Sequence, residues 1–165
     1  MSAMQTVAPF SSDSQLTHHR LRTAKVGCRW RVMIVDDHAS IREMIRIILN
    51  RYDDQIEITC EASDGEEAVA LAASRPVDLV LMDIALPNLN GIEATRRIRQ
   101  LLPYAAVVGI STAYKPHLYN AMVAAGAVAF VSKEEAVELL YKTMVFAMCA
   151  SRPAHIHGSP LPTST

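Results

Sequence analysis

The sequence predicts an α/β fold, a five-stranded, doubly wound parallel sheet with helices on both faces. Short apolar runs of strand length alternate five times along the chain with longer segments of helical pattern. Such alternation is typical of βαβ units, whose parallel strands are joined by right-handed crossovers. With 165 residues, half of them apolar, the chain is long enough to bury the core of one such domain.

The first βα unit is predicted from a strand at residues 32–35, which stops at two adjacent carboxylates. A helix is expected at about residues 39–50, where isoleucine and methionine recur at helical spacing. Ser40 and Glu43 have the spacing of a capping box at its start.

The second and third units follow the same order. Residues 56–62 alternate like a strand with one wetter face, and the turn at 63–66 carries a second capping box before a helix at 68–73. The third strand, at 77–82, is an apolar run, apart from Asp78, typical of a strand that is covered on both faces. Residues 90–93 are expected to cap the next helix.

The last two units have weaker helical patterns. A fourth strand is predicted at residues 105–110, and a helix at about 118–125 is expected to end at Gly126. A fifth strand at 128–131 leads to a third capping box at 132–135, which opens the last helix.

The domain organisation follows from where this pattern stops. Residues 1–29 are polar and are predicted to form a flexible N-terminal extension, 30–150 the folded domain, and 151–165 a disordered C-terminal tail. The extension turns basic near its end, which leaves open a solvated tail or an arm that contacts nucleic acid or an acidic partner.

Composition excludes several classes of protein. A formal net charge of −1 gives no general attraction to nucleic acid or anionic lipid. Cys28, Cys60 and Cys149 lack CxxC spacing, which argues against a disulfide framework or a zinc site. No apolar run reaches membrane-spanning length and no signal peptide is recognisable, so a cytoplasmic protein without membrane contact is expected.

Polar residues follow four of the predicted strands, and in a parallel sheet these strand ends meet at one edge. A single aspartate at such a position could merely cap a helix. Three carboxylates with a hydroxyl and a lysine instead predict a site for a phosphoryl group and a hard divalent cation such as Mg²⁺. These residues are Asp36, Asp37, Asp83, Ser111 and Lys133.

At these residues the chain resembles the receiver domain of bacterial two-component response regulators, over about residues 31–150. The family implies a (βα)5 flavodoxin-like receiver fold. The local sequence of the chain is most similar to receivers of LuxR-class regulators. The motifs that carry the resemblance are Val35-Asp36-Asp37-His38, Leu81-Met82-Asp83 with Pro87 and Asn90-Gly91, Ile110-Ser111, and Phe130-Val131-Ser132-Lys133.

The resemblance implies a role for each strand-end residue. Asp83 would be the phosphoacceptor, supplied by a sensor histidine kinase or a phosphotransfer protein. Asp37, Asp83 and the backbone carbonyl of Ala85 would ligate Mg²⁺, and Asp36 would act through water. The chain would catalyse only its own phosphorylation and dephosphorylation and would not be an enzyme in the wider sense.

Two further positions correspond to the family's switch. Ser111 and Lys133 would hold the phosphoryl oxygens, and Phe130 would be the switch aromatic, whose rotamer follows the movement of the Ser111 hydroxyl. From sequence alone Phe130 could equally be an ordinary core aromatic. The output face would be the fourth helix, fifth strand and fifth helix.

Three other functions stay open. The chain could be a dimerising adaptor that signals without phosphorylation, or a truncated DNA-binding regulator. Direct DNA binding is not expected, because a helix-turn-helix domain needs on the order of 60 residues and only 151–165 follow the last predicted helix. A phosphate-ester hydrolase would usually need a second acid two residues after Asp83, where Ala85 stands.

Overall fold

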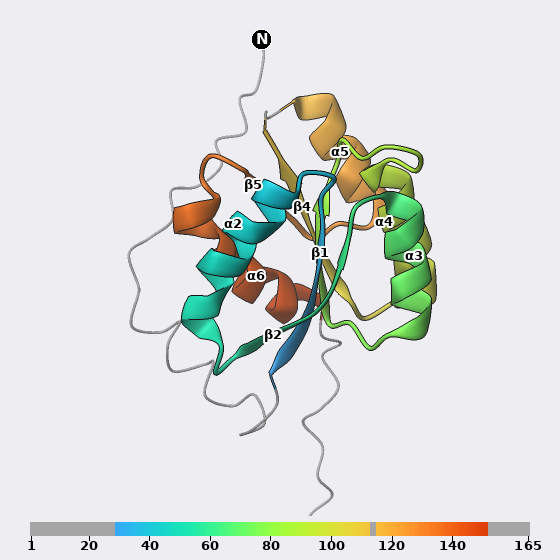
Figure 1. Ribbon diagram of the computed structural model, residues 1–165. Coiled ribbons are helices and arrows are strands. Elements are labelled where there is room, and N and C mark those ends of the chain that lie inside the picture. The colour runs from blue at the N-terminus through green and yellow to red at the C-terminus, as the bar shows by residue number, and fades with distance from the viewer. Residues whose placement is uncertain (1–28, 113–114, 152–165) are drawn as a thin grey trace, which may run out of the picture.

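The computed structural model describes residues 29–112 and 115–151, so the two predicted tails lie largely outside the described residues. Strands and helices alternate along the chain (Figure 1). In order they are β1 (Trp30–Val35), α2 (Ala39–Leu49), the 3-10 turn η2 (Asn50–Tyr52), β2 (Ile56–Ala62), α3 (Gly65–Ser74), β3 (Leu79–Asp83), α4 (Gly91–Leu101), β4 (Ala106–Ser111), α5 (Pro116–Ala125), β5 (Ala129–Ser132) and α6 (Ala136–Ser151).

All neighbouring strands are parallel, in the order β2-β1-β3-β4-β5, which confirms the predicted fold class. The strand order reverses between β1 and β3. In doubly wound sheets this switch point, beyond the carboxyl ends of the strands, is where ligands bind. A ligand site is therefore expected among the residues that follow β1 and β3.

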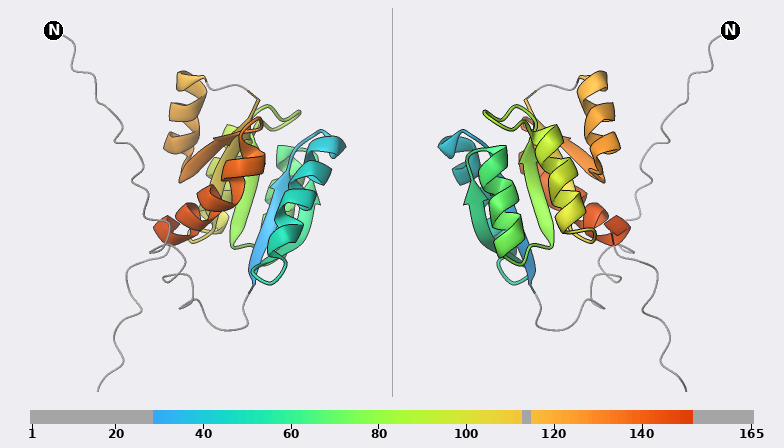
Figure 2. Two further views of the ribbon diagram at one scale, coloured as in Figure 1. Left: turned by 90° about the vertical axis from the view of Figure 1, so that its left-hand side faces the viewer. Right: turned by 90° about the vertical axis from the view of Figure 1, so that its right-hand side faces the viewer.

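Helices cover the sheet on both faces. Side chains from α2 and α6 pack with one face, and those from α3, α4 and α5 pack with the other. Figure 2 shows the two layers from opposite sides. β3 and β4 are buried along their whole length, as expected for strands between two helical layers. None of the helices in the described residues is long and apolar enough to cross a membrane.

The predicted cap of α4 is confirmed, whereas the capping box predicted at residues 63–66 for α3 is displaced by one residue, to Asp64 and Glu67. The carboxylate of Asp64 accepts a hydrogen bond from the Glu67 backbone N–H at 2.8 Å, and Asn90 accepts from Glu93 at 2.9 Å. Before α6, the Glu135 backbone N–H donates to the Ser132 hydroxyl, which donates in turn to the Glu135 carboxylate. Gly126 ends α5 with a φ of 106° in the left-handed region, as its position predicted.

The capping box predicted for α2 is wrong. The helix begins at Ala39, so Ser40 lies inside the first turn and His38 takes the N-cap position without a side-chain cap bond. The N-cap lies two residues before Ser40, because the His38 backbone N–H donates to the Asp36 carboxylate at 2.9 Å. Glu43 is left to pair with Arg46 along the helix.

Candidate functional site

The first part of the site is the turn that joins β1 to α2. Asp36 continues the β1–β2 ladder, since its backbone N–H donates to the Ala62 carbonyl at 3.1 Å, and the residue is only 1% exposed. Asp37, the next residue, keeps 32% of its side chain exposed. One carboxylate is thus fixed inside the domain while its neighbour reaches the surface.

The second part is the end of β3, where Asp83 is almost fully buried. Its Oδ1 accepts a hydrogen bond from the Ala85 backbone N–H at 3.3 Å. Its Oδ2 lies 2.9 Å from the Nζ of Lys133, which follows β5. The same Nζ lies 2.6 Å from Oδ2 of Asp36. A single ammonium therefore joins carboxylates from the ends of β1 and β3, two residues that stand 47 positions apart in the sequence.

The charge of Lys133 depends on this pairing. Burial alone lowers the pKa of Lys133, but its contacts with Asp36 and Asp83 outweigh that effect, and the pKa lies above the ordinary value for lysine. The ammonium accordingly stays charged at neutral pH. One positive charge faces two buried carboxylates and a third nearby, so the cluster keeps an excess of negative charge.

Ser111 ends β4, between β3 and β5, and is 7% exposed. Its carbonyl accepts a hydrogen bond from the Lys133 backbone N–H at 2.8 Å, which fixes the backbone that carries the lysine. The predicted set, Asp36, Asp37, Asp83, Ala85, Ser111 and Lys133, thus lies at the carboxyl edge of one sheet.

His38 is a member of this cluster that sequence reasoning did not identify. Its Nδ1 lies 2.7 Å from Oδ1 of Asp37, and the ligand atoms of Asp36, Asp37 and His38 all lie within 4.8 Å of one another. The only signal in the sequence is that His38 directly follows the two acids.

The donor set fits a hard divalent cation. Carboxylate oxygens of Asp36 and Asp37 lie close together, Asp37 is open to solvent, and the charge of Lys133 does not balance the acids. Mg²⁺ is held in proteins by one or two carboxylates and completes its shell with water or phosphate oxygens. Imidazole is a ligand for softer metals, which places His38 beside such a site as a partner of Asp37.

The loop after Asp83 is held close to the site. A Cβ on Gly91 would lie 1.9 Å from the Asp83 carbonyl oxygen, so only glycine allows this approach. Asn88 adopts a φ of 59°, a conformation that asparagine tolerates better than most residues. Its side-chain amide also donates to the Asp64 carboxylate at 3.4 Å, which ties the loop to the start of α3.

Phe130 on β5 is half-buried against the core layer of α3, α4 and α5. Its ring meets that of Tyr119 edge-on, with centroids 5.9 Å apart at 75°. A Cβ on Gly109 of β4 would lie 2.8 Å from Cδ2 of Phe130, so the ring occupies space that this glycine leaves open. Phe130 therefore does contact the core, and the same packing connects β5 to α5.

Comparison with known proteins identifies this arrangement. Residues 32–145 match the family model described as the response regulator receiver domain. The chain belongs to the response regulator receiver family. It is 32% identical over 126 residues to the transcriptional regulatory protein DegU of Brevibacillus brevis, a match that covers 76% of this chain and 52% of DegU. The chain spans about half the length of the curated relatives that it matches.

Solved structures agree with this family. The receiver domain resembles a two-component response regulator of the LuxR family from Aurantimonas sp. SI85-9A1, with a TM-score of 0.70, 31% identity, and coverage of 74% of this chain and 87% of that one. It also resembles a chain of the CheX-CheY-BeF3-Mg²⁺ complex from Borrelia burgdorferi, with a TM-score of 0.61, 26% identity, and coverage of 70% and 89%.

Proposed function

We propose that this receiver domain accepts a phosphoryl group on Asp83 from a histidine kinase or a phosphotransfer protein, in a reaction that depends on Mg²⁺. The observation that carries the proposal is the Lys133 ammonium, which lies 2.9 Å from Asp83 and 2.6 Å from Asp36. This arrangement offers a carboxylate nucleophile and a fixed cation at the same point. The comparison that supports it is the CheX-CheY-BeF3-Mg²⁺ complex from Borrelia burgdorferi.

The chemistry assigned to the side chains is a simple displacement. An oxygen of the Asp83 carboxylate attacks phosphorus, the new P–O bond forms, and the bond to the donor breaks with its electron pair leaving on the donor. The Lys133 ammonium offsets charge on the phosphoryl oxygens, and the Ser111 hydroxyl donates a hydrogen bond to them. The proposed metal ligands are Asp36, Asp37, Asp83 and the Ala85 carbonyl. Bound there, Mg²⁺ would reduce the repulsion between carboxylate and phosphoryl group.

The proposed output is a change on the face formed by α5, β5 and α6. An acyl phosphate adds negative charge and acceptor oxygens at Asp83, which attract the Ser111 hydroxyl. Through β4, this also changes the packing of Phe130. In this proposal the domain works in the cytoplasm and signals to a partner or to a second copy of itself. Sedimentation with and without beryllofluoride distinguishes it from a constitutive adaptor, whose association the mimic would leave unchanged.

The direct test is incubation of the whole chain with a small phosphodonor and Mg²⁺, followed by intact-mass measurement. We expect one phosphoryl adduct that is lost in Asp83→Asn. Asp78→Asn is the matched control, because Asp78 precedes the opposite end of the same strand and its loss should leave the adduct in place. A wild-type chain that gains no adduct, or an adduct that survives in Asp83→Asn, contradicts the proposal.

A further inference from the structure

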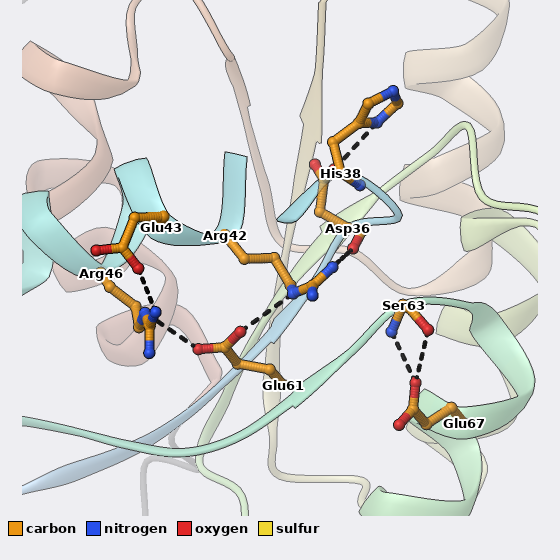
Figure 3. A network of polar contacts seen from close by, with 8 residues as sticks. All are labelled: Asp36, His38, Arg42, Glu43, Arg46, Glu61, Ser63 and Glu67. Carbon is orange, nitrogen blue, oxygen red and sulfur yellow. Dashed lines mark hydrogen bonds and ion pairs between the residues drawn. The ribbon is translucent and has the colours of Figure 1, made fainter. Parts of the chain in front are cut away.

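Arg42, in the first turn of α2, contacts the backbone of the acidic turn. Its Nη1 donates to the carbonyl oxygen of Asp36 at 2.7 Å, and its Nε donates to Oε2 of Glu61 on β2 at 3.1 Å (Figure 3). The side chains of Arg42 and Glu61 are 20% and 28% exposed. One guanidinium therefore joins the end of β1 to the neighbouring edge strand.

The acceptor on Asp36 is its backbone carbonyl oxygen, not its carboxylate. That carbonyl belongs to the peptide group that precedes Asp37, so bracing it sets the direction in which Asp37 leaves β1. The other groups of Asp36 are also held, its N–H by Ala62, its Oδ1 by the His38 N–H and its Oδ2 by Lys133. Arg42 supplies the remaining restraint, on the group nearest to Asp37.

An arginine suits this task better than a lysine would. Its planar fork can donate to Glu61 and to the Asp36 carbonyl at the same time, whereas an ammonium on a flexible stem is not held in one orientation. Glu61 fixes the plane of the guanidinium. Arg46, one turn further along α2, contacts the other oxygen of Glu61 more loosely, at 3.4 Å, and is half exposed.

We propose that Arg42 is a positioning residue for the candidate metal site, and that Glu61 acts through it. The brace holds the Asp36–Asp37 turn in the conformation that receives a divalent cation. Acceptance of a phosphoryl group on Asp83 then depends on Arg42 as well, and this second consequence rests on the function proposed above.

Mg²⁺ affinity tests the role of Arg42, because an effect through charge and an effect through positioning predict affinity changes of opposite sign when Arg42 is removed. Arg42 brings a positive charge close to the carboxylates, so if it acted through charge alone, its removal would strengthen Mg²⁺ binding. If it positions the turn, its removal weakens binding, and the loss of a partner that orients metal ligands typically costs 10- to 100-fold in affinity. The sign of the change therefore identifies the role.

The experiment is calorimetric titration of the whole chain with Mg²⁺. We expect Arg42→Met to weaken binding about tenfold or more. Arg42→Lys, which keeps the charge and loses the fork, should also weaken it, and Glu61→Gln should weaken it less because the bond to Asp36 remains. Arg46→Met is the matched control, since it removes a cation from the same helix but leaves the contacts of Asp36 intact. The Mg²⁺ affinity of this variant should not fall.

Urea unfolding of each variant shows that it is folded, and the mild Glu61→Gln change keeps the test usable should Arg42→Met fold poorly. The double variant Arg42→Met/Glu61→Gln should bind Mg²⁺ no more weakly than Arg42→Met alone, because the two changes disrupt the same brace. Equal or tighter binding by Arg42→Met, or no Mg²⁺ binding by the wild-type chain, overturns the proposal. Failure of the phosphoryl-adduct experiment with normal Mg²⁺ binding would overturn the proposed function and leave the role of Arg42 standing.

Discussion

The two ends of the sheet hold their charged side chains in opposite ways. At the amino end, Arg31 forms a two-pronged pair with Asp78, with its Nε 2.9 Å from one carboxylate oxygen and its Nη2 2.8 Å from the other. These side chains are 42% and 30% exposed. At the carboxyl end, Asp36, Asp83 and Lys133 are each at most 8% exposed. Charge is thus matched and hydrated at one end, and unbalanced and buried at the other.

The amino end also carries an aromatic contact between a helix and a turn. The rings of Tyr52 and Tyr141 are stacked, with centroids 3.7 Å apart and planes 2° from parallel. The Tyr141 hydroxyl lies 2.5 Å from Oε1 of Gln55, whose backbone carbonyl accepts from Trp30 at the start of β1. The polar groups of the amino end are paired with one another, whereas at the carboxyl end one ammonium is shared by two carboxylates.

Removing one cation from each end should show the difference most strongly. Lys133→Met leaves two buried carboxylates without their partner, and we expect it to lower the free energy of unfolding by about 3–5 kcal/mol. Arg31→Met breaks a pair that is partly in water, for which about 1 kcal/mol is expected. Urea denaturation in the presence of EDTA, followed by circular dichroism, measures both losses.

Mg²⁺ provides the control for that pair of variants. A divalent cation that binds the folded acids stabilises the fold by mass action and can offset their repulsion. Added Mg²⁺ should therefore narrow the difference in unfolding free energy between wild type and Lys133→Met, and leave the difference between wild type and Arg31→Met unchanged. Equal losses in the two variants, or equal recovery, would show that the two ends of the sheet do not differ in this way.

The sequence predicts the carboxyl end of the sheet better than its finer contacts. Strand and helix order is a local signal in apolar spacing, and parallel topology alone then brings Asp36, Asp83 and Lys133 to one edge. The contacts of His38 and Arg42 depend instead on side-chain directions in the first turn of α2. No spacing rule gives those directions in advance.

The failed prediction at the start of α2 has the same cause. Ser40 and Glu43 have correct capping-box spacing, but the bond from the His38 N–H to Asp36 places the N-cap at His38, two residues before Ser40. A contact made by the site therefore overrides a local helix signal. Asn90 caps α4 as predicted, and at α3 the cap lies one residue beyond the predicted Ser63, at Asp64.

A smaller effect is expected from Tyr141→Phe at the amino end. The change keeps the stack on Tyr52 and removes the hydrogen bond with Gln55, so the free energy of unfolding should fall by about 1 kcal/mol. The phosphoryl adduct at Asp83 should be unchanged, as measured by intact mass. Loss of the adduct in this variant would mean that the amino end is not separate from the site.

The smallest effect is a dependence on alkaline pH, to which both ends contribute with the same sign. Burial raises the pKa of Tyr141, with help from Tyr52 and Asp54, and pairing with the acids raises the pKa of Lys133 despite its burial. A group with a raised pKa in the folded state stabilises the fold below its unfolded pKa, about 10 for both groups, and that contribution is lost as pH rises through the folded pKa. The difference in unfolding free energy between wild type and Lys133→Met, or Tyr141→Phe, should therefore stay constant up to about pH 10 and shrink above it. Urea midpoints measured across this range test the sign. A difference that grows at alkaline pH would contradict a raised pKa of the Lys133 ammonium or the Tyr141 phenol in the folded state.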